Sequence, residues 1–107
     1  MRHADPGPPM TPSPELSVVV PVFNERDNIP PLVDEIVAAL RGHAPFEIVY
    51  VDDDSEDDSL AVLQSLKARV PELRVLHHVT RSGQSTAVRN GVKAARGAWI
   101  ATLDGDG

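Results

Sequence analysis

The sequence predicts an α/β fold in which a parallel β-sheet carries helices on both faces. Short runs rich in valine, isoleucine and leucine alternate with amphipathic segments along the 107 residues. These runs are apolar throughout, which is typical of strands buried on both faces of a sheet. Polar and acidic clusters follow three of the runs. Parallel sheets bind ligands beyond the carboxyl ends of their strands, so the clusters are candidates for one shared site.

The first strand is expected at residues 16–22, which read LSVVVPV. Pro21 has no N–H for a strand ladder, so the strand should end near it. Asn28 is placed to cap the helix that follows, and a Pro-Pro pair suits the first turn of that helix. Apolar residues then recur at helical spacing until Gly42, which is expected to end the helix.

The same alternation continues along the rest of the sequence. An acidic segment at 52–58 leads into a second amphipathic helix, for which Ser55 or Asp58 is the expected cap. A third helix has small residues on one face, which allows close packing on a sheet, and Ser85 is its candidate cap. We expect a strand at 46–51, a helix at 60–70, a strand at 73–76, a helix at 87–95 and a strand at 99–103.

The order β-α-β-α-β-α-β predicts right-handed crossovers and a Rossmann-like parallel sheet with flanking helices. We expect the strand order 3-2-1-4. The length suits one domain. Residues 1–14, which include five prolines, are expected to form a disordered lead-in, and residues 15–107 to form the domain.

Composition restricts the class of function. The formal net charge of -6 argues against a nucleic-acid binder, whose surface should be basic. The sequence has no cysteine, which excludes a disulfide framework and a cysteine-based zinc site and fits a reducing cytoplasm. No stretch approaches the roughly 20 apolar residues that span a bilayer.

The first candidate site is the segment Asp104-Gly105-Asp106. Two carboxylates around a glycine can turn toward one hard divalent cation and leave coordination positions for diphosphate oxygens. A solvated Asp-Gly turn is an alternative interpretation of these residues. A calcium loop is another, although the preceding WIATL is typical of a strand and not of an EF-hand helix.

Two further clusters follow the first and second strands. Asp52 and Asp53 belong to a run of three adjacent aspartates, whose carboxylates repel one another. Helix capping alone would not require such a run, so one of these aspartates is expected to accept hydrogen bonds from a nucleotide base. After Pro21, the ring of Phe23 can line a base or ribose pocket, and Glu25 can accept ribose hydroxyls. An ordinary turn is the alternative there.

The loop before the third helix contains Arg81 and Gly83. Backbone N–H groups at a helix N-terminus together with a guanidinium suit an anion, and a plain connector is the alternative. The sequence lacks the G-x-G-x-x-G fingerprint and the Walker loop. His43, His77 and His78 show no partner pattern and are expected to be structural or at the surface.

The order and spacing of these segments resemble family 2 glycosyltransferases of the GT-A fold. The resemblance rests on LSVVVPVFNERDNI, IVYVDDDSEDDS and RSGQSTAVRNGVKAARGAWIATLDGDG, and it covers residues 16–107. Within the family, the sequence is most similar to the branch of dolichol-phosphate mannose synthases and bacterial polyprenyl-phosphate glycosyltransferases. The resemblance implies an N-terminal nucleotide-binding half of a GT-A domain, truncated after the D-x-D motif.

The resemblance also implies a role for each matching residue. Phe23 stands where tyrosine is frequent in the family, and Asp54 stands where glycine is usual. Aspartate tolerates left-handed backbone better than most residues, so the turn at Asp54 can still form. The implied nucleotide-sugar contacts are Pro21, Phe23 and Glu25, then Asp52 and Asp53 at the base, then Arg81 and Gly83. The D-x-D residues Asp104 and Asp106 are the implied catalytic residues, which bind Mg²⁺ or Mn²⁺ and the diphosphate.

The implied activity is transfer of a sugar from a nucleotide-diphosphate sugar to a polyprenyl phosphate or another glycan or lipid acceptor. A lipid phosphate is already ionised at neutral pH, so catalysis would rest on charge neutralisation and positioning. The acceptor half and any membrane-associating part are expected beyond Gly107. We therefore expect the 107-residue chain alone to be inactive, and the full-length protein to be cytoplasmic at the inner face of the membrane.

Two alternatives from other classes stay open at this point. A non-catalytic nucleotide-binding or receiver-like signalling module would place its acidic pair after the first strand and a phospho-accepting aspartate after the third, where this sequence has His77 and His78. A nucleotidyltransferase would need a glycine-rich first loop with basic residues, and residues 20–26 lack one.

Overall fold

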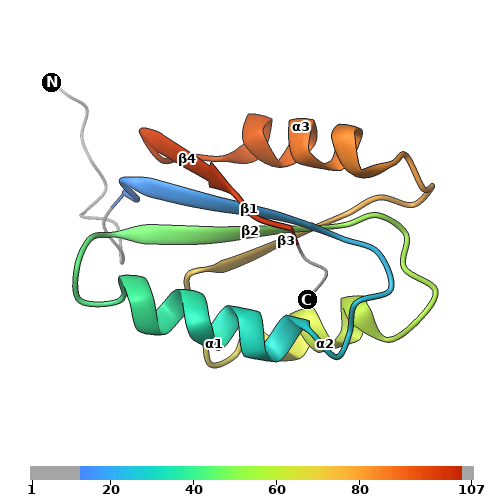
Figure 1. Cartoon of the computed structure of the whole chain (residues 1–107), viewed down its shortest axis with the longest axis horizontal. Helices are drawn as coiled ribbons and strands as arrows, with labels where there is room; N and C mark the ends of the chain where they lie inside the picture. Colours follow the sequence, from blue (N-terminus) through green and yellow to red (C-terminus); the bar gives the residue numbers. More distant parts are fainter. Residues whose placement is uncertain (1–12, 105–107) are drawn as a thin grey trace, which may run out of the picture.

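The computed structural model describes residues 13–104, and its elements follow the predicted order (Figure 1). Most of the lead-in predicted at residues 1–14, namely residues 1–12, and the predicted metal ligand Asp106 lie outside this range. The elements are β1 Leu16–Val22, α1 Ile29–Leu40, β2 Phe46–Asp52, α2 Ser59–Leu66, β3 Leu73–His77, α3 Gln84–Ala94 and β4 Trp99–Thr102.

The four strands form a parallel sheet with the order β3-β2-β1-β4, which confirms the predicted order. Val22 pairs with Asp52, and Asp52 pairs with His77, so β1, β2 and β3 end at the same level. Beyond β4, the N–H of Leu103 still donates to the carbonyl of Val19 at 3.0 Å. The loops after β1 and β2 and the loop before α3 therefore meet at the carboxyl edge of the sheet, on the right of Figure 1, whereas β4 ends nearer the centre of that view.

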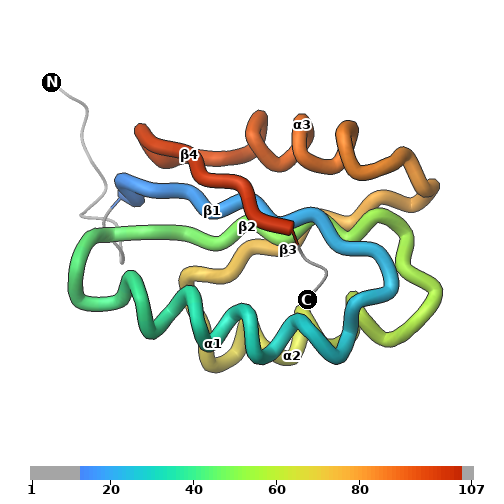
Figure 2. The backbone as a smooth tube through the Cα atoms, in the orientation of Figure 1, coloured from blue at the N-terminus to red at the C-terminus, as the bar shows by residue number. Residues whose placement is uncertain are grey.

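The helices form two layers around the sheet (Figure 2). α1 and α2 cover one face, and α3 covers the other, as the alternating pattern predicts. Alternate residues of β1 and β2 point to opposite faces. The side of α1 and α2 buries Val18, Val20, Ile48 and Tyr50 among others, and the side of α3 buries Val19, Val49, Val51 and Ala87.

The small-residue face of α3 lies against the sheet, as predicted. Gly91 is the point of closest approach, because a Cβ at this position would overlap the side chain of Val19. Gly97 follows α3 and lies equally close to β1: a Cβ there would be 2.7 Å from the backbone nitrogen of Ser17. These contacts fix the position of α3 on the sheet and of the turn that connects α3 to β4.

The helix ends differ from several predictions. Asn28 occupies the N-cap of α1, but its side chain donates to Glu25 at 2.6 Å instead of accepting a helix N–H. α3 begins at Gln84, so Gly83 and not Ser85 is its N-cap residue. α2 ends at Leu66, earlier than the expected 70, because the chain turns before Pro71. None of the helices within residues 13–104 is long and apolar enough to cross a membrane.

Candidate nucleotide site at the carboxyl edge of the sheet

A cavity of about 210 Å³ opens at the carboxyl edge of the sheet. It gathers side chains from the end of β1 and the loop after it, from the loop after β2, and from the loop before α3 and the start of α3. The most distant of them in sequence, Pro21 and Ala87, are 66 positions apart. Five of the predicted site residues line it. The lining residues are Pro21, Val22, Phe23, Glu25, Asp53, Arg81, Gln84 and Ala87.

The loops after β1 and β2 lie side by side (Figure 2) and are joined by hydrogen bonds of Asn24. Asn24 has a left-handed backbone with φ 54°. Its side-chain Oδ1 accepts the N–H groups of Glu56 at 2.7 Å and Asp57 at 3.2 Å, and its own N–H donates to Ser55 Oγ at 2.9 Å. Asn24 therefore fixes the loop that presents its neighbours Phe23 and Glu25.

These contacts replace the capping that the sequence pattern predicted for α2. Asp58, one of the two expected caps, occupies the N-cap position of α2, but its side chain makes no capping hydrogen bond. Ser55 Oγ instead accepts the N–H of Asn24, and Asp57 Oδ1 accepts the N–H of Ser59 at 2.9 Å. Asp54 has φ 60°, which confirms that aspartate supports the left-handed turn after Asp53.

Asp53 is the most highly coordinated side chain of the site. Its Oδ1 accepts His78 Nδ1 at 2.8 Å, Ser82 N at 2.9 Å and Ser82 Oγ at 3.2 Å, and its Oδ2 accepts Gly83 N at 2.8 Å. Burial alone would raise the pKa of Asp53, but the hydrogen bonds from His78, Ser82 and Gly83 outweigh it and hold this pKa below its ordinary value. At neutral pH Asp53 is therefore an ionised, acceptor-only group.

His78 couples Asp53 to α3. The Nδ2 amide of Asn90 lies 3.0 Å from His78 Nε2, so Nε2 acts as acceptor and Nδ1 carries the proton that is donated to Asp53. Asp52 lies deeper and does not line the cavity. It is fully buried and contacts His77 Nδ1 at 3.0 Å, and its Oδ1 has no hydrogen-bond partner among the described residues.

Arg81 and Phe23 form a stacked pair. The guanidinium carbon of Arg81 lies 3.8 Å from the centre of the Phe23 ring, within the range of a cation–π contact. Arg81 Nε is also 4.0 Å from Asp53 Oδ2. The side chain of Arg81 is 61% exposed, so the guanidinium covers one side of the cavity and remains accessible to an anion.

Asp104 lies at the end of β4, next to the cavity. Its Oδ1 accepts the side-chain amide of Gln84 at 3.0 Å, and Gln84 itself lines the cavity. Residues 13–104 contain no group of three or more His, Cys, Asp or Glu side chains that could enclose a metal ion. A single exposed carboxylate with one oxygen engaged and one available suits Mg²⁺ or Mn²⁺, which take hard oxygen ligands and often complete their shell with substrate phosphates and water.

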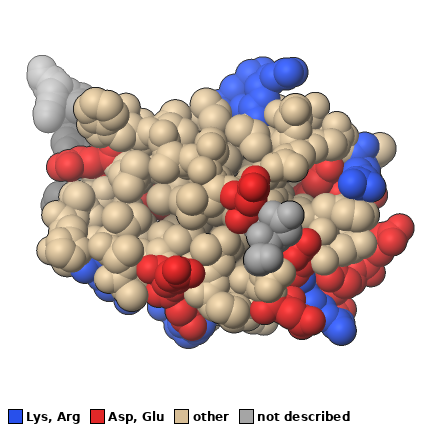
Figure 3. All heavy atoms as spheres, in the orientation of Figure 1, with Lys and Arg blue, Asp and Glu red and all other residues tan. Residues whose placement is uncertain are grey.

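Acidic side chains gather around this edge, and Figure 3 shows them on the right and in the centre of that view. Asp54, Glu56, Asp57 and Asp58 all belong to the loop between β2 and α2. A polyanion would be repelled from such a surface unless cations compensated. Arg81 provides one positive charge at the cavity itself.

The cavity contains five residues that the sequence pattern singles out, but other residues that shape it carry no such signal. Asn24, His78, Ser82 and Gln84 were assigned no specific role. The sequence predicts that His78 is structural or at the surface, and in the structure it has a structural role as a hydrogen-bond donor to Asp53. The signal that could have found it is its place one residue after β3, level with Asp53 after the neighbouring β2.

Comparison with known proteins gives a consistent result. The family model described as Glycosyl transferase family 2 matches residues 17–107. Dodecaprenyl-phosphate galacturonate synthase from Rhizobium johnstonii is 40% identical over 94 residues, which cover 86% of this chain and 28% of the relative. Dolichol-phosphate mannosyltransferase from Pyrococcus furiosus is 38% identical over 92 residues, which cover 86% of this chain and 26% of the relative.

Solved structures share the fold. A mannosyltransferase from Pyrobaculum calidifontis in complex with GDP-Man and Mn2+ superposes with a TM-score of 0.77 at 23% identity, covering 94% of this chain and 31% of that one. S. aureus TarS in complex with UDP-GlcNAc gives a TM-score of 0.74 at 28% identity, covering 86% and 26%. The chain thus spans about a quarter to a third of the length of these proteins. With the family model matching nearly the whole described fold, the chain belongs to glycosyl transferase family 2.

Proposed function

We propose that this chain provides the donor-nucleotide site of an enzyme that transfers a sugar from a nucleotide-diphosphate sugar to a polyprenyl phosphate. The observation that carries the proposal is the cavity in which Phe23, Glu25, Asp53 and Arg81 converge at the carboxyl edge. Family membership and relatives named for dodecaprenyl-phosphate and dolichol-phosphate transfer support it. The strand order also argues against a receiver-like module, which would follow the order 2-1-3-4-5.

Asp53 is proposed to bind the base. A carboxylate offers about four acceptor positions. Oδ1 of Asp53 is occupied by His78 and Ser82, whereas Oδ2 accepts one hydrogen bond, from Gly83. Oδ2 therefore retains a position for an N–H of the base. Asp52 lies behind Asp53 and is proposed to act on the nucleotide only through the position of this loop.

The remaining cavity residues are proposed to hold the ribose and the diphosphate. Glu25 is partly exposed and held by Asn28, and it can accept ribose hydroxyls. Pro21 and Phe23 form the apolar wall. Arg81, stacked on Phe23 and followed by the N–H groups at Gly83 and the start of α3, supplies positive charge for a phosphate.

Asp104, with Asp106 beyond the described range, is proposed to hold a divalent ion, Mg²⁺ or Mn²⁺. When bound, such an ion neutralises the charge of the departing nucleotide diphosphate. Gln84 donates to Oδ1 of Asp104, and Oδ2 is proposed for this role. Catalysis then rests on the alignment of donor and acceptor, because a lipid phosphate is already ionised.

The acceptor surface is proposed to belong to a part of the protein that these residues do not include. A membrane-associated acceptor would place the protein at the cytoplasmic face of the membrane. We expect the 107-residue chain to bind nucleotide diphosphates without transferring sugar. Transfer of a labelled sugar by this chain alone would contradict that expectation.

Isothermal titration of the chain with GDP and UDP, with and without Mn²⁺, tests the nucleotide site. Asp53→Asn is expected to weaken the preferred nucleotide by about tenfold, since it removes the charge of the acceptor and one of its two oxygens. Asp54→Asn is the matched control, because it removes the same charge from the adjacent residue and asparagine also tolerates the left-handed backbone. That variant should bind within about twofold of the parent.

Three results would count against the proposal. The first is a folded chain that binds neither nucleotide. The second is an equal loss of affinity in the Asp53→Asn and Asp54→Asn variants, which would indicate general electrostatics and not a base contact. The third is an affinity that Mn²⁺ leaves unchanged, which would contradict the metal role of Asp104 and Asp106.

A further inference from the structure

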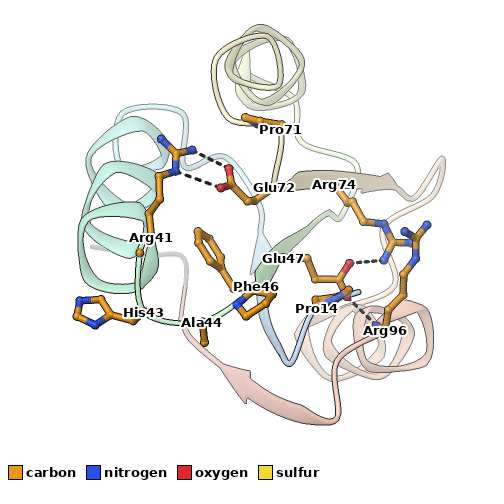
Figure 4. Close-up of a pocket in the computed structure, with 12 residues that line it drawn as sticks. Pro14, Arg41, His43, Ala44, Phe46, Glu47, Pro71, Glu72, Arg74 and Arg96 are labelled. Atoms are coloured by element: carbon orange, nitrogen blue, oxygen red, sulfur yellow. Dashed lines mark hydrogen bonds and ion pairs between the residues drawn. The ribbon is translucent and has the colours of Figure 1, made fainter. Parts of the chain in front are cut away.

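A second and larger cavity, of about 520 Å³, lies at the opposite, amino edge of the sheet (Figure 4). Its walls come from the end of α1, the starts of β2 and β3, and the turn between α3 and β4. Residues 48–52 of β2 lie between Glu47, which lines this cavity, and Asp53, which lines the other, a distance of about 20 Å. It is therefore distinct from the proposed nucleotide site.

The base of this cavity is held rigidly. Phe46 and Glu47 begin β2 and are 7% and 5% exposed. Glu47 accepts Arg74 Nη1 at 2.8 Å, Ser17 Oγ at 2.6 Å and the backbone N–H of Arg96 at 2.7 Å. A preformed wall of this kind is what small-molecule sites share, and the volume lies in their usual range.

The charges around the cavity are unequal. Three arginines face two glutamates across it. Arg41 is held by Glu72 through two hydrogen bonds at 2.7 and 3.1 Å, and Arg74 is held by Glu47. The guanidinium of Arg96 has no hydrogen-bond or ion-pair partner in the part of the chain that the structure describes. The cavity therefore carries one uncompensated cation although the whole chain has a formal net charge of -6.

The apolar lining lies between these charged groups. Phe46, Ala44 and Pro45 form one continuous apolar stretch of chain, and Figure 4 shows Phe46 and Ala44 between Arg41 on one side and Arg96 on the other. An inorganic anion would use only the cation, and a neutral apolar molecule would use only this stretch. A ligand that matches both has an apolar ring and one anionic group.

We propose that this cavity binds a small organic anion, with its ring on Phe46 and Pro45 and its phosphate or carboxylate paired with Arg96. Arginine suits either group because its guanidinium can donate two parallel hydrogen bonds. The site is independent of sugar transfer and of the nucleotide site.

The test is ¹H–¹⁵N NMR titration of the 107-residue chain with four probes: phenyl phosphate, benzoate, inorganic phosphate and benzyl alcohol. We expect saturable shifts at the amides of Phe46, Glu47 and Arg74 with phenyl phosphate or benzoate. Phosphate and benzyl alcohol each lack one half of the ligand and should bind at least about tenfold more weakly. The stronger of the two anionic probes identifies the preferred acid.

Arg96→Gln should weaken the best probe by about tenfold. The hydrogen bond from residue 96 to Glu47 is made by the backbone N–H, so this variant retains it. Lys93→Gln removes an equal charge from α3 outside the cavity and should change the affinity by less than about twofold. Ala44→Phe fills the cavity without changing its charge and should abolish the shifts.

The proposal fails if the shifts appear instead at Phe23, Asp53 and Gly83. It fails also if benzyl alcohol matches the anions, or if the Arg96→Gln and Lys93→Gln variants lose affinity equally. Should Arg96→Gln not fold, unchanged shifts in folded Ala44→Phe would still overturn it.

Discussion

Two carboxylates at the two ends of β2, Glu47 and Asp53, hold the two ends of α3, and their electrostatic surroundings are opposite. Glu47, at the start of the strand, binds the backbone N–H of Arg96, which follows α3. Asp53, directly after the strand, binds the backbone N–H groups of Ser82 and Gly83, which precede α3. The same helix is thus anchored to the same strand at both edges of the sheet.

The partners of the two carboxylates differ in charge. Glu47 lies near the C-terminal end of α3, where the helix dipole disfavours an anion, and it is paired with Arg74, which also donates to the carbonyl of Ala94 at 2.9 Å. Asp53 lies at the N-terminal end, where the dipole favours an anion, and its close hydrogen bonds come from two N–H groups, a hydroxyl and a histidine.

This difference explains why the carboxyl edge can hold a site. Because the helix dipole and backbone N–H groups stabilise Asp53, no arginine is needed as its counter-ion. Arg81 remains 4.0 Å away and stacks on Phe23, where it is accessible to a ligand. At the amino edge, Arg74 forms the ion pair with Glu47, and only the guanidinium of Arg96 has no partner among the described residues.

The largest expected loss of stability comes from removing Glu47, which holds the C-terminal end of α3 at the amino edge of the sheet. Glu47→Ala leaves Arg74 without its counter-charge and the buried Ser17 without its acceptor, and it should lower the free energy of unfolding by about 3 kcal/mol. Asp53→Ala leaves only uncharged or exposed donors without an acceptor, and it should lower the free energy of unfolding by about 1–2 kcal/mol. Urea denaturation of the two variants measures both values.

The comparison would be wrong if Asp53→Ala cost as much as Glu47→Ala. Glu47→Gln is the control for shape, because it retains a hydrogen-bonding side chain and loses only the charge. Its stability should lie between that of the parent and that of Glu47→Ala.

The glycines at the two ends of α3 give the next effect. A Cβ at Gly97 would lie 2.7 Å from Ser17 N and 2.8 Å from the carbonyl carbon of Leu16, both of which are backbone atoms. Gly97→Ala should therefore lower the free energy of unfolding by about 2 kcal/mol through overpacking. Gly83 has open space around it but φ +95°, so Gly83→Ala should cost about 1 kcal/mol through backbone strain. Equal losses in thermal unfolding would indicate that space is not limiting at Gly97.

The framework of this comparison was predictable from the sequence. The bounds of β1 follow from an uninterrupted apolar run and are confirmed. The alternation of strands and helices predicts a parallel sheet, and the expected strand order 3-2-1-4 is also confirmed. The chemistry of the carboxyl edge was predicted as a set of residues, and the cavity contains five of them. The strand bounds depend on local apolar patterns, and the gathering of the site residues depends on parallel strands that end at one edge of the sheet.

The anchors themselves could not be predicted, because they depend on contacts between residues far apart in sequence. Glu47 meets Arg96 across 49 positions, and Asn24 meets Glu56 across 32. The same contacts explain why Ser55 does not cap α2 although serine is a good cap by residue type: its hydroxyl accepts the N–H of Asn24 and holds the first loop. Side-chain oxygens have several possible donors, and only the register of the strands selects among them.

A smaller effect should appear as acid sensitivity. Burial alone would raise the pKa values of both Glu47 and Asp53, yet their hydrogen bonds hold both below the ordinary range. Both groups thus bind protons more weakly in the folded state than in the unfolded chain, where their pKa values are about 4.3 and 3.9. The stability that they contribute is present above about pH 5 and is lost as pH falls through the folded pKa values. Urea midpoints between pH 7 and pH 3 measure this loss, and an unchanged slope in Glu47→Gln would contradict it.

The smallest effect tests whether the carboxyl edge positions its metal ligand. Gln84 donates to Asp104 Oδ1 at 3.0 Å, and both side chains are exposed, so the hydrogen bond contributes little to folding. If this hydrogen bond orients the carboxylate of Asp104, the Mn²⁺-dependent increase in affinity for GDP or UDP should be about two- to threefold smaller in Gln84→Leu than in the parent. The affinity without metal should be unchanged. Gln64→Leu, at an exposed position of α2, is the control for adding leucine to the surface. Titration calorimetry with and without Mn²⁺ separates the two affinities, and an equal decrease in both would mean that Gln84 acts on the cavity as a whole and not through Asp104.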